Sequence, residues 1–118
     1  MRVFLKSATM LLLLGFLVGC QVERRKSDQE LGLNAEQARG RRVYDNQCIR
    51  CHEPYSSREL HGPSLAKTYK KPYLPSGIPV NDDRMRDVIL MGKTKMPAFN
   101  QTLTEKQLQD LLAYLKTL

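Results

Sequence analysis

The clearest pattern of hydrophobic positions lies at the carboxyl end of the chain. From residue 104 onward, leucines recur at intervals of three and four, which is the spacing of one face of an α-helix. They are Leu108, Leu111, Leu112, Leu115 and Leu118. Thr104 is followed three residues later by Gln107, and this pair has the pattern of a capping box at a helix start. The sequence therefore predicts an amphipathic helix over residues 104–118.

A second apolar stripe predicts a helix over residues 81–92. Met85, Val88 and Ile89 fall at i, i+3 and i+4, so they share one helical face. Asn81 precedes the stripe as an N-cap, and Gly92 is placed to end the helix.

A third helix is predicted over residues 34–47. Asn34 and Gln37 form another capping-box pattern. The predicted polar side of this helix carries Arg39, Arg41 and Arg42. The predicted packing side carries Ala38, Gly40, Val43 and Tyr44.

The stretch between the helices predicted over residues 34–47 and 81–92 is rich in proline, since residues 53–80 contain five of the six prolines. Proline disrupts both helix interiors and central strands, so this stretch is predicted to be structured loop with a short helix near residues 64–69. No alternating strand pattern of useful length occurs elsewhere. We therefore predict an all-α domain.

Length and composition indicate a single small globular domain. The chain has 118 residues, of which 42% are apolar and 26% charged, which argues against wholesale disorder. So short a chain gains much from an additional hydrophobic nucleus such as a cofactor. The formal charge of +7 is compatible with nucleic acid, an anionic membrane or an acidic protein partner.

The amino terminus has the three-part pattern of an export signal. Arg2 and Lys6 precede an apolar stretch over residues 8–18, and small Gly19 comes just before Cys20. The stretch is shorter than the roughly 20 residues of a membrane-spanning helix. Residues 17–20 resemble the lipobox of bacterial lipoproteins, which implies that residues 1–19 are removed and Cys20 is lipidated. We expect residues 20–33 to form a flexible tether and residues 34–118 to form the domain.

The central chemical motif is Cys48-Ile49-Arg50-Cys51-His52. A Cys-x-x-Cys-His run is the attachment sequence of c-type haem, because two thiols three residues apart can reach both vinyl groups and the next residue can offer its imidazole to the iron. Three alternatives are a thioredoxin-like dithiol, a zinc site with His61 as the fourth ligand, and a disulfide. A thioredoxin-like site expects a βαβ context, which this chain lacks.

An electron-carrying haem iron needs a second axial ligand. Met96 is the best candidate, because Pro97 keeps it in a loop and can aim its thioether inward. Met85 and Met91 lie on a predicted helix and are expected to belong to the core. His61 is expected to be a surface or loop histidine.

Taken in order, these motifs resemble a class I cytochrome c over residues 34–118. The resemblance is carried by Gly40, Val43 and Tyr44 before the haem motif, by Gly62-Pro63 and Leu65 after it, by residues 95–99 around Met96, and by residues 113–115 in the last helix. It implies a cytochrome c fold of three to five helices wrapped around one covalently attached haem c.

The resemblance also implies individual roles. His52 would be the proximal ligand and Met96 the distal one, and the Pro63 carbonyl would accept the ring N–H of His52. Gly40 would allow the first and last helices to cross closely. Because the chain has no Trp to bond a haem propionate, Tyr69 or Tyr73 is expected to do so.

These features together predict an electron carrier and not an enzyme. We expect a monomer on the periplasmic side of a bacterial membrane, anchored by its lipid, that exchanges electrons with redox proteins. Five lysines in loops could steer acidic partners: Lys67, Lys70, Lys71, Lys93 and Lys95. Two alternatives stay open: a haem subunit fixed to one dehydrogenase or oxidase, and a gas-binding sensor with an open iron site. Export argues against nucleic-acid binding.

Overall fold

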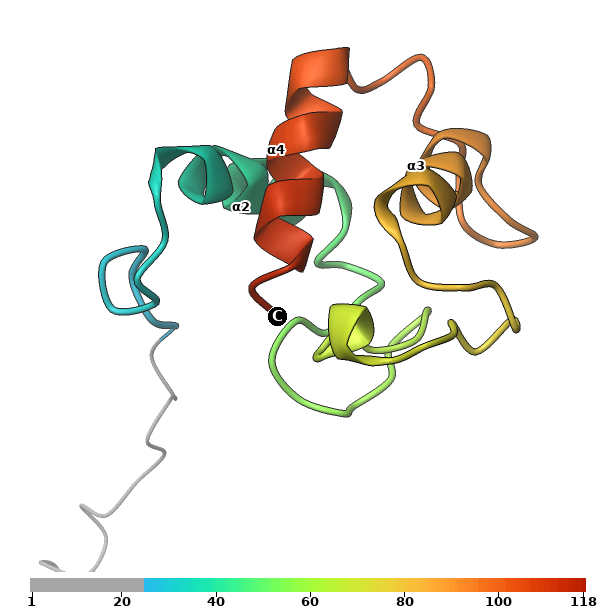
Figure 1. Cartoon of the computed structure of the whole chain (residues 1–118), viewed down its shortest axis with the longest axis horizontal. Coiled ribbons are helices and arrows are strands. Elements are labelled where there is room, and N and C mark those ends of the chain that lie inside the picture. Colours follow the sequence, from blue (N-terminus) through green and yellow to red (C-terminus); the bar gives the residue numbers. More distant parts are fainter. Residues whose placement is uncertain (1–24) are drawn as a thin grey trace, which may run out of the picture.

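The computed structural model of the chain describes residues 25–118, in which three α-helices and one short 3₁₀-helix follow one another (Figure 1). They are α2 (Ala35–Gln47), η1 (Thr68–Lys70), α3 (Asp82–Met91) and α4 (Glu105–Leu115). Within this part of the chain there is no strand, only isolated bridges between Tyr73 and Pro79 and between Lys93 and Met96. The predicted all-α class is therefore confirmed. None of the described helices is long and apolar enough to cross a membrane.

The helix starts follow the predicted capping chemistry. Asn34 and Thr104 each cap a helix and each exchange hydrogen bonds with the glutamine three residues on, so both capping boxes are present. Asn81 caps α3, and Gly92 ends it with a φ of 69°. The side chains of Asn34, Asn81 and Thr104 thus accept hydrogen bonds from backbone N–H groups that a helix start leaves without partners.

Two boundaries differ from the predictions. The last helix ends at Leu115, not Leu118, although Leu118 is still buried because the chain turns and its carbonyl accepts the Lys67 amide at 2.8 Å. The short helix in the Pro-rich stretch is η1, which begins at Thr68 and so overlaps only the end of the predicted residues 64–69.

Helices α2 and α4 cross closely, and Gly40 is the reason that they can (Figure 1). A Cβ atom added at Gly40 would lie 1.8 Å from the Asp110 carbonyl oxygen and 2.9 Å from Tyr114 Cβ. Tyr44 and Tyr114 pack beside this crossing edge to face, with ring centroids 5.4 Å apart. The crossing therefore brings backbone against backbone, flanked by two fully buried aromatic rings.

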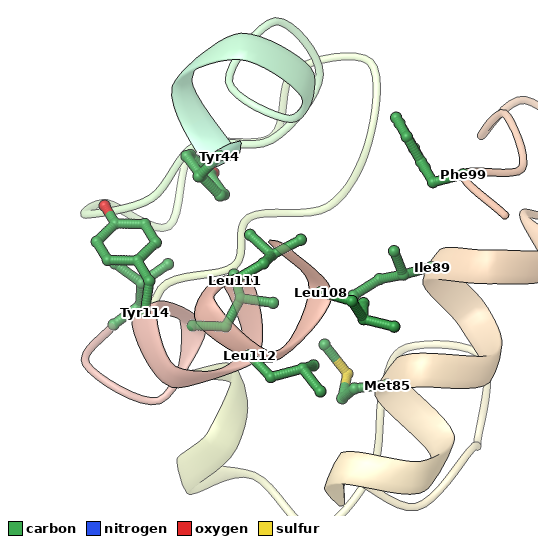
Figure 2. Close-up of a cluster of buried hydrophobic side chains, with 10 residues drawn as sticks. Tyr44, Met85, Ile89, Phe99, Leu108, Leu111, Leu112 and Tyr114 are labelled. Carbon is green, nitrogen blue, oxygen red and sulfur yellow. The ribbon is translucent and has the colours of Figure 1, made fainter. Parts of the chain in front are cut away.

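The leucine face of α4 forms the centre of the hydrophobic core (Figure 2). Its partners are Met85 and Ile89 on α3 and Phe99 in the following loop, all buried. The predicted core role of Met85 is confirmed. Met91 was also expected in the core, but it is 76% exposed. It is the last residue of α3 and does not belong to the apolar stripe of Met85, Val88 and Ile89.

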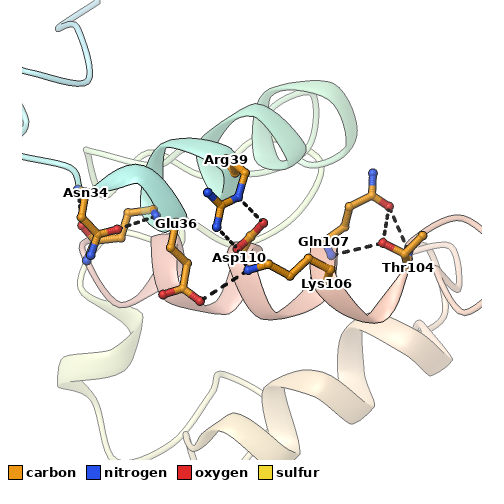
Figure 3. A network of polar contacts seen from close by, with 8 residues as sticks. Asn34, Glu36, Arg39, Thr104, Lys106, Gln107 and Asp110 are labelled. Atoms are coloured by element: carbon orange, nitrogen blue, oxygen red, sulfur yellow. Dashed lines mark hydrogen bonds and ion pairs between the residues drawn. The ribbon is translucent and has the colours of Figure 1, made fainter.

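A buried carboxylate joins α2 to α4 (Figure 3). Asp110 accepts two hydrogen bonds from Arg39, at 2.9 and 3.1 Å, and one from Lys106 at 2.6 Å. These bonds, led by that from Arg39, outweigh desolvation and hold the pKa of Asp110 below its ordinary value. The carboxylate therefore stabilises the fold at neutral pH.

Replacing Asp110 with asparagine should lower the free energy of unfolding at pH 7 by about 1.5–3 kcal/mol, the range for hydrogen bonds to charged groups. A lowered native pKa contributes stability that is present above the unfolded-state pKa and is lost as the pH falls through the native one. The variant should thus lose less stability on acidification than the parent. Denaturant titrations at several pH values measure this. Asp87→Asn, in the exposed pair with Arg84, is the control and should change stability by under about 0.5 kcal/mol.

Arg41 is a correction to the predicted polar face of α2. It is only 7% exposed, because the segment that precedes α2 folds back over it. Its guanidinium donates to Asp28 Oδ1 and to the Lys26 carbonyl, each at 2.6 Å. Residues 25–33, the described part of the predicted tether, thus lie against α2. The signal peptide and Cys20 lie outside the described residues, so the predicted domain boundaries stay predictions.

Candidate functional site

A cavity of about 860 Å³ lies between α3, α4 and three loops. Its walls are mainly apolar and include Val88, Ile89, Leu111, Leu115 and Phe99. The volume and lining are those of a site that takes a large, mostly apolar cofactor with few polar contacts. The cavity therefore supplies the extra hydrophobic nucleus that a chain of this length was expected to need.

The haem-attachment motif occupies the turn in which α2 ends and faces this cavity. Cys48 is the C-cap of α2, and its carbonyl accepts the amides of Cys51 and His52, both at 3.0 Å. This tight turn places both sulfurs and the imidazole among the lining residues. Both cysteines are free thiols in the structure. Burial, with smaller effects of Cys51 and Asp45, raises the pKa of the Cys48 thiol to about 12.

Two hydrogen bonds hold His52, one at its imidazole and one at its main-chain carbonyl. Its Nδ1 lies 2.7 Å from the Pro63 carbonyl oxygen, so Nδ1 carries the proton and donates. The Tyr44 hydroxyl donates to the His52 carbonyl at 2.7 Å. Because Nδ1 is the donor, Nε2 is the unprotonated nitrogen that can bind a metal, and the carbonyl partner fixes the ring and raises its basicity.

Gly62 lies directly against the His52 imidazole and leaves no room for a side chain. A Cβ atom added there would lie 2.6 Å from His52 Cε1 and 3.0 Å from Nδ1, and the Gly62 amide donates to the Cys51 carbonyl at 2.8 Å. The residue before Pro63 must therefore be glycine if the imidazole is to keep its position.

Replacing Gly62 with alanine should turn or displace the His52 ring and weaken its bond to Pro63. Because the partner of Nδ1 tunes the basicity of Nε2, the variant should show a changed midpoint potential and shifted imidazole resonances in NMR spectra of the haem-loaded protein. Gly77→Ala is the control for an added methyl group away from His52: its φ of 78° makes alanine unfavourable for stability there, but no atom lies within 4 Å of the added carbon, so the potential should stay unchanged. Identical potentials for the Gly62 variant and the parent would contradict the packing argument.

Met96 reaches the cavity from a loop that is itself tightly constrained. It is half-buried and lines the cavity, and the Lys93 amide donates to its carbonyl at 3.0 Å. At Gly92 a Cβ atom would lie 2.5 Å from the same carbonyl, and the φ of 69° favours glycine as well. The structure thus brings the thioether of Met96 to the cavity that the haem motif lines.

Of the other candidate residues, two line the cavity and two do not. His61 is exposed, as expected, but also lines the cavity, and so does Met85. Neither Tyr69 nor Tyr73 lines it. Burial and the nearby Asp82 carboxylate raise the pKa of Tyr69, whereas Tyr73 is 57% exposed. The propionate role of the two tyrosines gains no support and stays a prediction.

Sequence reasoning missed part of the lining. Arg50, inside the haem motif, lines the cavity together with Lys93 and Lys95 of the predicted basic loops, and no acidic residue does. The lysines of the 67–71 segment lie elsewhere on the surface. The wall that was missed comes from Leu74, Pro75 and Ser76, where no helical periodicity marks which residues face inward.

The zinc alternative finds no support among residues 25–118. No group of three or more His, Cys, Asp or Glu side chains in that range is placed to hold a metal ion. By contrast, two thiols, an imidazole with Nδ1 already bonded, and a large apolar cavity fit one haem c. The fold and the site thus define a small protein of the c-type haem class.

Comparisons with known proteins agree with this class. The family model described as "Cytochrome C oxidase, cbb3-type, subunit III" matches residues 35–115. Cytochrome c6 of Thermosynechococcus vestitus is 33% identical over 82 residues, which are 70% of this chain and 70% of that protein. Cytochrome c6 of Synechococcus elongatus is 32% identical over 80 residues, 68% of this chain and 87% of that protein.

The chain belongs to the cytochrome c family. It binds one haem c covalently through the Cys48 and Cys51 pattern, and it functions in haem-based electron transfer with redox protein partners. It is an electron carrier and not an enzyme in its own right. The expected fold, cofactor and carrier function are therefore confirmed.

Proposed function

We propose that the protein carries single electrons on a haem iron held between His52 and Met96, and that it shuttles them between redox proteins on the exported side of a bacterial membrane. The observation that carries this proposal is that both residues line the same cavity as Cys48 and Cys51. The haem, when bound, supplies an iron that changes between its ferric and ferrous states.

The residues of the chain have separate tasks in this function. Pro63 keeps the proton on His52 Nδ1 at 2.7 Å, so Nε2 is free for the iron. The soft thioether of Met96 favours the ferrous state and raises the potential relative to two histidines. The apolar wall excludes water and disfavours the additional charge of the ferric state. With His52 and Met96 both holding the iron, no substrate would need to bind it for electron transfer.

The visible spectrum of the reduced protein tests the axial pair. Expressed with a haem-ligation system, the protein should keep its haem through denaturation and show the iron–methionine charge-transfer band when oxidised. Carbon monoxide should bind the native ferrous protein poorly. Rapid, complete binding would favour the open iron of a gas sensor instead.

The proposal includes export and lipid attachment at Cys20. Its support is the pattern of residues 1–20, in which an export signal runs into a lipobox. Two acyl chains are what stable anchoring requires. Mass spectrometry of the membrane fraction should find an amino-terminal peptide that begins at Cys20 and carries a diacylglycerol. A peptide with an unmodified Cys20 would contradict the anchor.

The cations at the cavity suit an acidic partner. Arg50, Lys93 and Lys95 are exposed and line the cavity, and no Asp or Glu lines it. A rim of one sign raises the encounter rate with a partner of opposite sign, and salt screens this effect.

Charge reversal of the rim gives a prediction with a matched control. The pair of changes Lys93→Glu and Lys95→Glu should slow electron transfer to an acidic partner roughly tenfold or more at low ionic strength, with little difference at high salt. Stopped-flow kinetics over a range of salt concentrations measures this. The pair Lys70→Glu and Lys71→Glu changes the charge equally away from the cavity and should have a smaller effect. Equal effects of the two pairs would contradict steering by the rim.

A second candidate function is that of a haem subunit held in an oxidase. The description of the matching family model, which names an oxidase subunit, favours it. Purification from mild detergent separates the two: a fixed subunit co-purifies with a stoichiometric partner, whereas a free carrier sediments as a monomer.

A further inference from the structure

Residues 25–33 fold into a hydrogen-bonded turn before α2 begins. The Ser27 amide donates to Glu30 Oε2 at 2.7 Å. The Leu33 amide donates to the Asp28 carbonyl at 3.0 Å, and the Leu33 side chain packs against the hydrophobic core. This segment, which we call the clasp, therefore has a defined conformation, although its composition predicted a flexible tether.

Two arginines fasten the clasp to α2. Arg41 is buried and reaches Asp28 Oδ1 and the Lys26 carbonyl, each at 2.6 Å. Arg25 pairs with Asp45 on the same helix. A buried guanidinium needs such partners, and the clasp supplies them to both terminal nitrogens of Arg41, although its Nε has none.

The clasp lies far from the haem cavity and from the lysines at its rim. None of residues 25–33 lines the haem cavity. In Figure 1 the amino-terminal turn and the loop that follows α3 lie at opposite sides of the molecule, with α2 and α4 between them. That loop carries Lys93, Lys95 and Met96.

We propose that the clasp orients the domain on the membrane, with α2 toward the lipid and the cavity rim toward the aqueous side. This inference rests on the proposed anchor at Cys20. Only residues 21–24 separate Cys20 from the clasp, and the step from Cys20 to Arg25 spans at most about 18 Å. That length is less than the roughly 30 Å diameter of a small domain, so the domain cannot turn its cavity toward the lipid while the clasp is closed.

Opening the clasp removes this restriction. A tether running from residue 20 to residue 33 has a maximum length of about 45 Å, which exceeds the same diameter. A closed clasp thus presents Lys93 and Lys95 to partners continuously, whereas an open one lets the domain tumble at the surface.

Hydrogen exchange tests the clasp independently of any membrane. In haem-loaded protein with Cys20→Ser, the Leu33 amide should exchange at least tenfold more slowly than in the double variant Asp28→Asn, Asp45→Asn. Asp87→Asn, which removes an exposed ion pair on α3, is the control and should leave this rate unchanged. Unprotected exchange at Leu33 in the parent would overturn the proposal.

Polarised absorption of the haem tests the orientation. The protein with a free Cys20 is coupled to a lipid maleimide and placed in oriented bilayers, so the result does not depend on natural lipidation. The parent should be dichroic, and the double variant should approach the isotropic value. An isotropic parent, or a double variant with the dichroism of the parent, would overturn the proposal. Failure of natural anchoring is read separately, from an unmodified Cys20 in the mass spectrum.

Discussion

Met96→Ala should lower the midpoint potential by a large part of the roughly 0.8 V range that axial ligands set. The physical reason is that, in the proposed function, the thioether of Met96, which lines the cavity, would be the soft ligand that favours the ferrous state. The oxidised variant should also lose the iron–methionine charge-transfer band, and the ferrous variant should bind carbon monoxide rapidly. Redox titration and optical spectroscopy measure these effects.

Met91→Ala is the matched control, because it removes the same side chain five residues earlier in the chain. Met91 is 76% exposed and does not line the cavity, so its loss should leave the potential, the band and the carbon monoxide reaction unchanged. If Met96→Ala behaved like this control, the ligand assignment would be wrong.

The parts of the fold that the sequence predicted are those specified by local chemistry. Capping boxes at Asn34 and Thr104 involve residues only three positions apart, and the leucine stripe of α4 reads directly as a buried face. The haem motif is equally local, since Cys48, Cys51 and His52 lie within one turn. Such features can be recognised before any tertiary contact is known.

The features that the sequence did not predict depend on contacts between distant segments. Arg41 reads as a surface residue of α2 until the chain from residue 26 to residue 28 covers it. The clasp is predicted to be a tether because its sequence is polar, mixed in charge and without an apolar stripe, whereas the ion pairs that join it to α2 involve residues 13 and 20 positions further along the chain. Met91 is predicted in the core because the sequence of a helix does not show which of its apolar residues another segment covers. In the structure Met91 lies in the final turn of α3 and is exposed.

The site also combines features that the local sequence shows with features that depend on contacts between distant segments. Met96 could be selected from sequence because Pro97 marks its loop, and the structure brings it to the cavity. Tyr69 and Tyr73 are predicted as propionate partners only because the chain has no Trp for that role, and neither lines the cavity. Arg50 was overlooked, although its position between two haem-binding cysteines already placed it beside the cavity.

Gly40→Ala tests the contact on which the α2–α4 crossing depends. Helix propensity alone would favour alanine by about 1 kcal/mol. The added Cβ, however, would lie 1.8 Å from the Asp110 carbonyl oxygen, so the two helix backbones must move apart. That movement disrupts the packing of Tyr44 on Tyr114 and the Arg39–Asp110 bonds. We expect a net loss of about 3 kcal/mol or more in the free energy of unfolding, the upper end for overpacking.

Denaturant unfolding of the haem-loaded protein measures the loss, and Asn46→Ala provides the control. Asn46 is exposed on the same helix, so alanine there gains helix propensity without meeting α4, and its stability should equal or slightly exceed that of the parent. A Gly40 variant as stable as this control would mean that the helices can separate at no cost. Because Gly40 fixes how closely α2 approaches α4, and α4 provides Leu111 and Leu115 to the cavity wall, its effect also extends to the site. A stable variant with an unchanged cavity would therefore contradict both the close crossing and its role in shaping the haem site.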